Sequence, residues 1–254
     1  MGEQTMETQK KVSLTKKDLN KCYIRLSLWG ETSLNFERMQ GIGFCNAMIP
    51  ALKKLYTTKE DLSEALKRHL QFFNTELMFG NLIFGPTIAL EEEKAENPDK
   101  IPDELITSFK TGTMGPVAAI GDTIHWGTAW TLGMALIASM AAKGNMISIA
   151  IMLALFAAFE VTAYLLFRLG YKTGRMSFTK IMKSGKLDEL LDSANILGMF
   201  MMGALSASFV KLELAAAIPV SGGGMISIQD SLNSLVPGLL PLLCVFGIYT
   251  VIKR

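Results

Sequence analysis

The chain has 254 residues, of which 50% are hydrophobic, and a formal net charge of only +2. So small and dispersed a charge argues against a nucleic-acid partner, and a mean hydropathy of +0.31 favours a membrane protein over a soluble one. The cysteines are three in number and widely spaced, which excludes a disulfide framework and a cysteine metal knuckle.

Residues 1–14 are predicted to form an N-terminal tail. No apolar signal segment with a small-residue cleavage site occurs there, so we expect the amino terminus to remain in the cytoplasm. Residues 15–110 are predicted to form a cytoplasmic or re-entrant helical part. Thr15 and Thr58 each precede a typical helix start. From Lys59 to Phe73 one helical face is mainly apolar, and the charged residues, including Arg68, lie on the others. An amphipathic surface helix is therefore expected in that segment.

The segment Phe72 to Leu90 is apolar but interrupted by polar residues, glycines and a proline. A straight span is not expected there, and a re-entrant or broken hairpin is predicted. The acidic stretch from Glu91 to Glu104 contains two prolines and predicts a solvated loop.

Residues 111–254 are predicted to form the transmembrane part. Thr111 to Thr128 reads TGTMGPVAAIGDTIHWGT, with Asp122 inside an apolar stretch. One interpretation is a broken membrane helix, in which the acid faces a partner or a watery cavity. The other is a glycine- and proline-containing loop that Asp122 caps at the membrane surface.

Four apolar runs are each near the roughly 20 residues that cross the hydrocarbon. They are Trp126 to Ala142, Met146 to Leu166, Ala194 to Val210 and Leu232 to Ile252. We therefore expect an all-α integral membrane protein with amphipathic and broken or re-entrant N-terminal helices, followed by about four transmembrane helices. Pro237 and Pro241 predict a kink in the last run. The 170–192 loop is rich in lysine and arginine, so we expect it to be cytoplasmic, and the 211–230 segment is expected to face outward.

The polar residues give several hypotheses about chemistry. His69 is expected to have a structural role, whereas His125 follows Asp122 by three residues. A proton relay through Asp122, His125 and Glu160 is one hypothesis, because acids and histidines in membranes often carry protons. Neither a Ser-His-Asp set nor an HExxH or CxxC motif occurs, so we expect no self-contained catalysis and no cofactor.

A second set of polar residues suits a neutral polyhydroxylated ligand. Asn35, Glu37, Arg38 and Gln40 cluster in LNFERMQ, and the pair Asn74-Thr75 interrupts a later apolar run. Carboxylates and amides can bond to pairs of hydroxyl groups. The alternative is that these side chains satisfy irregular backbone and pair with one another.

Several long motifs together resemble one known family. They are NFERMQGIGFCNAMIPALKKLY at 35–56, EALKRHLQFFNT at 64–75, ALEEEKA at 89–95, GTMGPVAAIGDTIHWGT at 112–128 and ANILGMFMMGAL at 194–205. The chain closely resembles the IID component of mannose-family sugar phosphotransferase systems, and the resemblance covers residues 15–252 as one family unit.

The resemblance implies a multi-pass subunit of the bacterial inner membrane that is not itself an enzyme. It implies a IIC membrane partner, a trimer of IIC–IID pairs in the lipid bilayer, and cytoplasmic IIA and IIB proteins that carry phosphate to the entering sugar. Carried over by motif, the candidates for the sugar path or its IIC border are Asn35, Glu37, Gln40, Asn74, Thr75 and Asp122. The resemblance does not say which hexose, amino sugar or ketose is carried.

This sequence departs from the family pattern at three places. Leu34 stands where tryptophan is common, Glu76-Leu77 replaces His-Pro or Gln-Pro, and His125 replaces phenylalanine. Members also usually have a further apolar segment after the position of Arg254. Two other functions remain as alternatives: an autonomous proton-coupled sugar transporter, and a membrane receptor or scaffold that uses the 211–230 segment.

Overall fold

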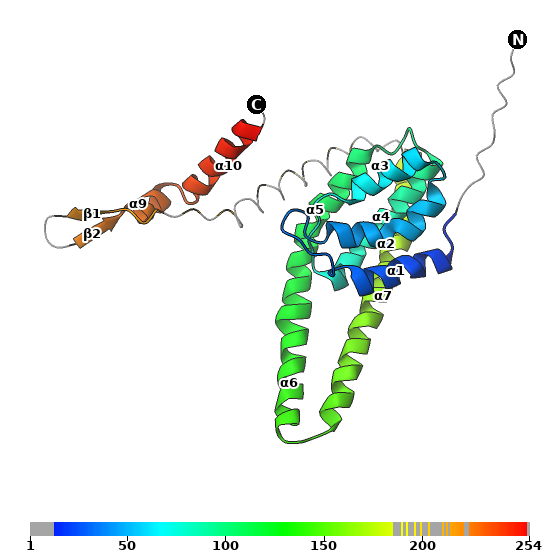
Figure 1. Ribbon diagram of the computed structural model, residues 1–254, viewed down its shortest axis with the longest axis horizontal. Coiled ribbons are helices and arrows are strands. Elements are labelled where there is room, and N and C mark those ends of the chain that lie inside the picture. The colour runs from blue at the N-terminus through cyan, green and yellow to red at the C-terminus, as the bar shows by residue number, and fades with distance from the viewer. Residues whose placement is uncertain are drawn as a thin grey trace, which may run out of the picture. The chain divides into compact units, whose positions relative to one another are not determined.

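A computed structural model describes residues 13–184, 214–220 and 224–252, with scattered positions between 189 and 212 (Figure 1). The chain divides into two compact units, Met1–Gly198 and Met199–Arg254. The described part is mainly helical, and its two short strands are confined to the second unit.

The first three helices are α1 (Lys16–Trp29), α2 (Gly41–Leu55) and α3 (Lys59–His69). The Thr15 hydroxyl accepts a hydrogen bond from Asp18 N, and the Asp18 carboxylate accepts one from Thr15 N, which completes a capping box. Thr58 likewise accepts from Asp61 N. Both predicted helix starts are confirmed. The end of α3 was predicted four residues too late, and Arg68 is buried rather than solvated.

Helix α4 (Leu77–Glu96) is continuous, so the predicted broken hairpin over Phe72 to Leu90 is wrong. Gly85 and Pro86 of α4 pack closely against helix α7 (Ile147–Ser184). A Cβ added to Gly85 would lie 2.6 Å from the Phe167 carbonyl oxygen, and one added to Gly174 would lie 2.8 Å from Pro86 Cα. The residues that suggested a break therefore form the surface of α4 against which α7 packs.

We expect Gly85→Ala to lower the free energy of unfolding by about 1–3 kcal/mol, because the new methyl group overpacks this contact. Thermal unfolding of the detergent-solubilised protein measures the effect. The matched control is Gly247→Ala, because a Cβ there meets nothing within 4 Å. Equal unfolding temperatures for the two variants would contradict the close α4–α7 contact.

The acidic stretch is not the solvated loop predicted from the sequence. Glu91 and Glu92 lie in α4 and are 0% and 2% exposed, and only residues 97–102 separate α4 from α5 (Asp103–Gly121). Buried carboxylates require partners. Arg68 is a partner of Glu91, and Tyr171 and Arg175 are partners of Glu92.

Helix α5 continues into a π-helix, η1 (Asp122–Trp130), and then into α6 (Thr131–Ala142). The predicted break within Thr111 to Thr128 is therefore wrong, because the chain passes from an α-helix to a π-helix without leaving the helical conformation. The hydroxyls of Thr128 and Thr131 donate to the carbonyls of Thr123 and Trp126, five residues back, which matches the wider π turn.

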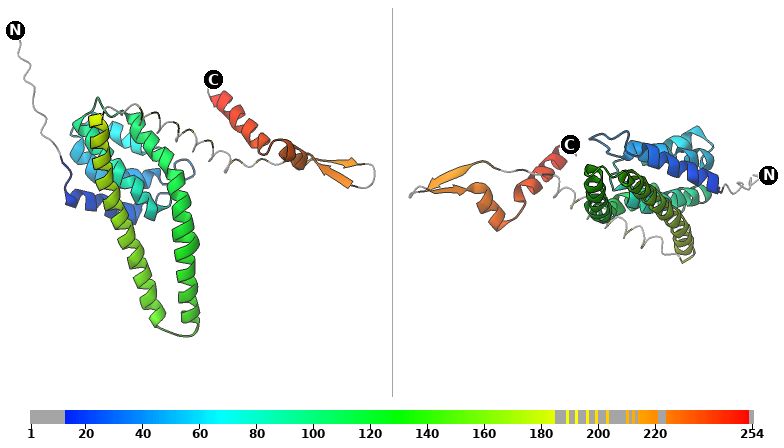
Figure 2. Two further views of the ribbon diagram at one scale, coloured as in Figure 1. Left: turned by 180° about the vertical axis from the view of Figure 1, so that it is seen from behind. Right: turned by 90° about the horizontal axis from the view of Figure 1, so that it is seen from below.

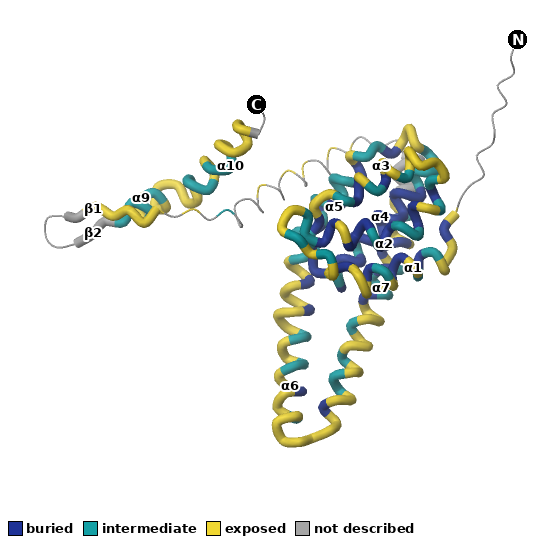
Figure 3. Tube along the Cα trace, viewed as in Figure 1, coloured by how far each residue is buried: buried dark blue, intermediate teal, exposed yellow. Residues whose placement is uncertain are grey.

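Helices η1 and α6 and the first part of α7 form a long hairpin that extends from the other helices of the first unit (Figures 1 and 2). Most residues of its arms are exposed or partly exposed (Figure 3). Large exposed apolar residues include Leu132, Leu136, Leu153, Val161 and Leu165. Such a surface suits lipid or a second protein rather than water.

Among the described residues, one helix, Ile147–Ser177, is long and apolar enough by itself to cross a membrane. Helix α7 runs on to Ser184, so the first part of the predicted 170–192 loop is helical instead. The predicted span Ala194 to Val210 lies largely outside the described residues. The expected total of about four spans therefore stays a prediction.

The second unit contains an antiparallel hairpin, β1 (Ala217–Val220) and β2 (Gly224–Ser227), in which Ile218 pairs with Ile226. This hairpin occupies much of the predicted 211–230 segment and is an exception to the all-α expectation. Helices α9 (Ile228–Leu235) and α10 (Leu239–Ile252) follow. They meet at 85° across the three residues that include Pro237, which confirms the kink predicted there.

Candidate functional site

Two connections bring the candidate sugar motifs together. The connection between α1 and α2 lies against the one between α3 and α4: Gln40 N donates to Phe73 O at 2.8 Å, and Phe73 N donates to Arg38 O at 3.3 Å. Met39 lies between Arg38 and Gln40, the two residues that form these bonds, and has a φ of 49°. A left-handed residue other than glycine is uncommon and carries a cost, so the surrounding contacts must hold this turn in place.

Gln40 and Thr75 join the two connections through a pair of hydrogen bonds. The Gln40 amide donates to Thr75 O at 2.8 Å and accepts from Thr75 N at 3.0 Å, while the Thr75 hydroxyl donates to Met114 O at 3.0 Å. Both residues are buried, at 5% and 4% exposure. Their polar groups satisfy irregular backbone, as the alternative interpretation of the motif expects.

The remaining candidates are more accessible. Asn35 Oδ1 accepts from Arg38 N at 2.8 Å, which closes the turn. Glu37 forms an exposed ion pair with Arg38 at 3.2 Å. Asn74 is half-buried, and Asp122 is exposed at the start of η1. The structure therefore groups five of the six candidates on two adjoining connections and places Asp122 on a separate helix.

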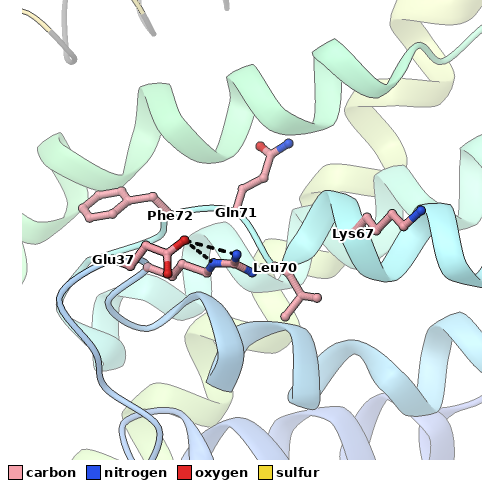
Figure 4. A pocket seen from close by; sticks show the side chains of 6 residues that line it. Glu37, Lys67, Leu70, Gln71 and Phe72 are labelled. Atoms are coloured by element: carbon pink, nitrogen blue, oxygen red, sulfur yellow. Dashed lines mark hydrogen bonds and ion pairs between the residues drawn. The ribbon is translucent and has the colours of Figure 1, made fainter. Parts of the chain in front are cut away.

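A cavity of about 400 Å³ opens beside these connections (Figure 4). It is lined by Glu37, Arg38, Lys67, Leu70, Gln71 and Phe72. The lining offers a carboxylate, a guanidinium, an ammonium and an amide, and it also offers an aromatic ring. Four of the six lining residues are thus polar or charged, and Leu70 and Phe72 supply the apolar surface. Lys67, Gln71 and Phe72 were not predicted as site residues, because only the fold places them on the same cavity as Glu37.

Glu76 and His125 form a buried pair that the motif analysis did not predict. His125 Nδ1 lies 2.9 Å from Glu76 Oε1, and the two residues are 9% and 6% exposed. Two of the three departures from the family pattern therefore contact each other. Glu160 instead accepts hydrogen bonds from the hydroxyls of Tyr23 and Ser27. The structure thus gives His125 and Glu160, two members of the hypothesised relay, separate partners.

A second buried cluster centres on Glu91. Its carboxylate accepts two hydrogen bonds from Arg68, at 2.8 and 2.9 Å, and lies 2.8 Å from His69 Nε2. The Tyr56 hydroxyl donates to it at 2.6 Å. Lys110 Nζ lies 3.4 Å from His69 Nδ1 and 4.5 Å from the Phe44 ring centroid. His69 thus has the structural position expected for it, in a network that joins α3, α4 and α5.

Three groups in this cluster have lowered pKa values, for different reasons. Burial, with the charge of Lys110, lowers the pKa of His69 to about 4. Burial lowers the pKa of Lys110 to about 7, although Glu91 opposes this. Burial alone would raise the pKa of Glu91, but hydrogen bonds and charge from His69 and Arg68 lower it to about 2. His69 is therefore neutral at pH 7 and donates Nε2–H to the Glu91 carboxylate.

Acid is expected to destabilise this cluster. All three pKa values are lower in the folded protein than in the unfolded chain, so the unfolded chain binds protons more tightly and stability falls as pH falls. The His69 contribution is lost between pH 6.5 and about 4, and that of Glu91 between 4.5 and about 2. Unfolding temperatures in detergent across this range measure the effect, and His69→Gln should flatten its upper part. A midpoint that rises on acidification would contradict the assignment.

Comparisons with known proteins agree on one family. The family described as PTS system mannose/fructose/sorbose family IID component matches residues 13–254. The mannose-specific EIID component of Escherichia coli K12 is 35% identical over 98% of this chain and 90% of that protein. The fructose permease IID component of Bacillus subtilis is 38% identical over 93% and 86%. A chain in a cryo-EM structure of the mannose transporter ManYZ with microcin E492 is 35% identical, with a TM-score of 0.75 over 95% of this chain and 89% of that one.

Proposed function

This chain belongs to the mannose/fructose/sorbose family of phosphotransferase IID components and is a membrane subunit of a sugar permease; from this premise we propose that it pairs with a IIC subunit to form the path of a sugar. The sugar is a hexose, amino sugar or ketose that IIB phosphorylates during uptake. One observation carries the proposal, which is that the family match covers residues 13–254. The similarity to a chain in a structure of a mannose transporter supports it.

The adjoining connections are the proposed sugar-path region. Asn35, Glu37, Gln40, Asn74, Thr75 and Asp122 are assigned to the path or to its border with IIC. Within this set, Glu37 presents an exposed carboxylate to the cavity, whereas Gln40 and Thr75 hold the two connections in register. Contact with a sugar is therefore proposed first for Glu37 and Asn74, and a supporting role for Gln40 and Thr75.

The exposed apolar arms of α6 and α7 are proposed to lie in the bilayer and against IIC. The amino terminus is proposed to lie in the cytoplasm, together with the IIA and IIB proteins that carry the phosphoryl group. Three IIC–IID pairs are proposed to assemble into one complex in the bacterial plasma membrane. Phosphoryl transfer belongs to IIA and IIB in this proposal.

Purification from membranes tests the pairing. A tagged chain, co-expressed with a IIC subunit of the same family, should be extracted only with detergent and should retain IIC in equal amount. A chain that enters aqueous buffer without detergent, or that leaves IIC behind, would contradict the proposal. Uptake distinguishes the proton-coupled alternative, because that transporter would respond to an uncoupler and ignore loss of phosphoenolpyruvate.

A further inference from the structure

Glu76 connects the start of α4 to the π-helix. Its two carboxylate oxygens accept hydrogen bonds from Met78 N and Phe79 N, each at 2.8 Å, so the side chain caps α4. An ionised carboxylate has acceptors only, so with Glu76 in that form His125 Nδ1–H donates the bond to Glu76 Oε1. A buried, charge-assisted bond of this kind is among the stronger ones in proteins.

The same side chain is pressed against the first turn of the π-helix. A Cβ added to Gly121, the residue before Asp122, would lie 2.3 Å from Glu76 Oε2. The preceding residue, Thr75, is held by its hydroxyl to Met114 O. The segment that carries Asn74 and Thr75 is therefore fastened to one continuous helix at two places, Met114 and His125.

Among the described residues, the His125 ring has one polar contact, its hydrogen bond with Glu76. Its Nε2 is buried and has no hydrogen-bond partner among the described residues. The ring packs edge-on against Phe159 at 4.4 Å and beside Trp126 at 5.1 Å between centroids. The bond from Nδ1 to Glu76 is thus the contact that couples the register of the π-helix to the connection between α3 and α4.

We propose that Glu76 and His125 form a positioning pair that sets the place of Asn74 and Thr75 relative to Asp122, and thereby the affinity of the path for its sugar. The inference rests on the proposed function, because it assigns those three residues to the sugar path. Neither member of the pair needs to touch the sugar. Loss of the bond is expected to weaken binding of the sugar more than it slows phosphoryl transfer by IIB.

Two substitutions at His125 separate the hydrogen bond from the ring. His125→Phe keeps an aromatic ring but lacks the donor, and His125→Asn lacks the ring but places an amide donor near the position of Nδ1. In membranes that contain IIC, phosphoenolpyruvate-dependent uptake should show about a tenfold rise in KM for the phenylalanine variant, with kcat little changed. The asparagine variant should have a smaller rise. Glu76→Gln weakens this bond because its amide oxygen is an uncharged acceptor, and His125→Phe removes the donor. Since both changes act on the same bond, the double variant should be no worse than its worse single member.

Glu92→Gln is the matched control. It replaces another buried carboxylate of α4, which bonds Tyr171 rather than the π-helix, and should leave KM unchanged. Unfolding temperatures of all variants show whether each one folds. If His125→Phe does not fold, Glu76→Gln alone tests the effect of the bond on KM. If the wild-type complex transports sugar and the pair variants keep its KM, or if asparagine is worse than phenylalanine, the pair has no positioning role. If the wild-type complex carries no sugar, the proposed function fails instead.

Discussion

Glu91→Gln is expected to lower the free energy of unfolding of the first unit by about 3–5 kcal/mol, because it leaves buried cations without their counter-charge. The Arg68 and Glu91 side chains are 4% and 0% exposed, so water cannot replace the lost carboxylate. Lys110 is also buried and lies against His69 in the same cluster. Denaturant unfolding in detergent, followed by circular dichroism, measures the change.

Glu93→Gln is the control for this substitution, because it lies two residues away on α4 and is half-buried. Its carboxylate accepts a hydrogen bond from Asn97, and its replacement should change stability by no more than about 0.5 kcal/mol. Arg68→Met combined with Glu91→Gln should cost less than the sum of the two single changes. Equal stability of the Glu91 and Glu93 variants would show that the cluster does not hold α3 to α4.

Glu37→Ala is expected to raise the KM for sugar about ten- to hundredfold, because a hydrogen bond to a charged group is worth roughly 1.5–3 kcal/mol. The Glu37 side chain is 77% exposed, so its removal should leave folding almost unchanged. Uptake driven by phosphoenolpyruvate, measured over a range of sugar concentrations, gives the KM.

Glu64→Ala provides the comparison, since it removes another exposed carboxylate, from the surface of α3, away from the cavity lining. Its KM should equal that of the wild type. An unchanged KM for Glu37→Ala as well would remove Glu37 from the sugar path and leave its ion pair with Arg38 as a surface contact.

The helix starts and the main membrane helix could be predicted because their signals are local. Thr15 and Thr58 cap the helices that follow them, and the apolar run after Met146 forms the first part of α7. The end of α3 was misplaced because His69 and Phe73 lie on one buried face, although the chain has already turned at Leu70.

The errors share a physical cause, which is that a distant residue changes the meaning of a local signal. Gly85 and Pro86 are typical of a break, yet α7 lies against them and uses the space that the missing side chain leaves. Glu91 belongs to an acidic run typical of a loop, but Arg68 neutralises it from another helix. The π-helix gave no distinct signal in the sequence.

The candidate site was predictable in composition but not in geometry. The motif residues Gln40 and Thr75 do meet, although they are 35 positions apart, and their side chains hold backbone. The contact between Glu76 and His125 spans 49 positions. Each was visible only as a separate departure from the family pattern, and a single sequence does not show that two such positions touch.

Proteoliposomes offer the most direct test of the claim that this chain and a IIC subunit together form a sugar path. Vesicles that contain both subunits, with IIA, IIB, the general phosphotransferase proteins and phosphoenolpyruvate inside, should accumulate sugar phosphate from sugar added outside. Vesicles with either membrane subunit alone should accumulate none. Equal accumulation by vesicles that contain only the IIC subunit would contradict the account.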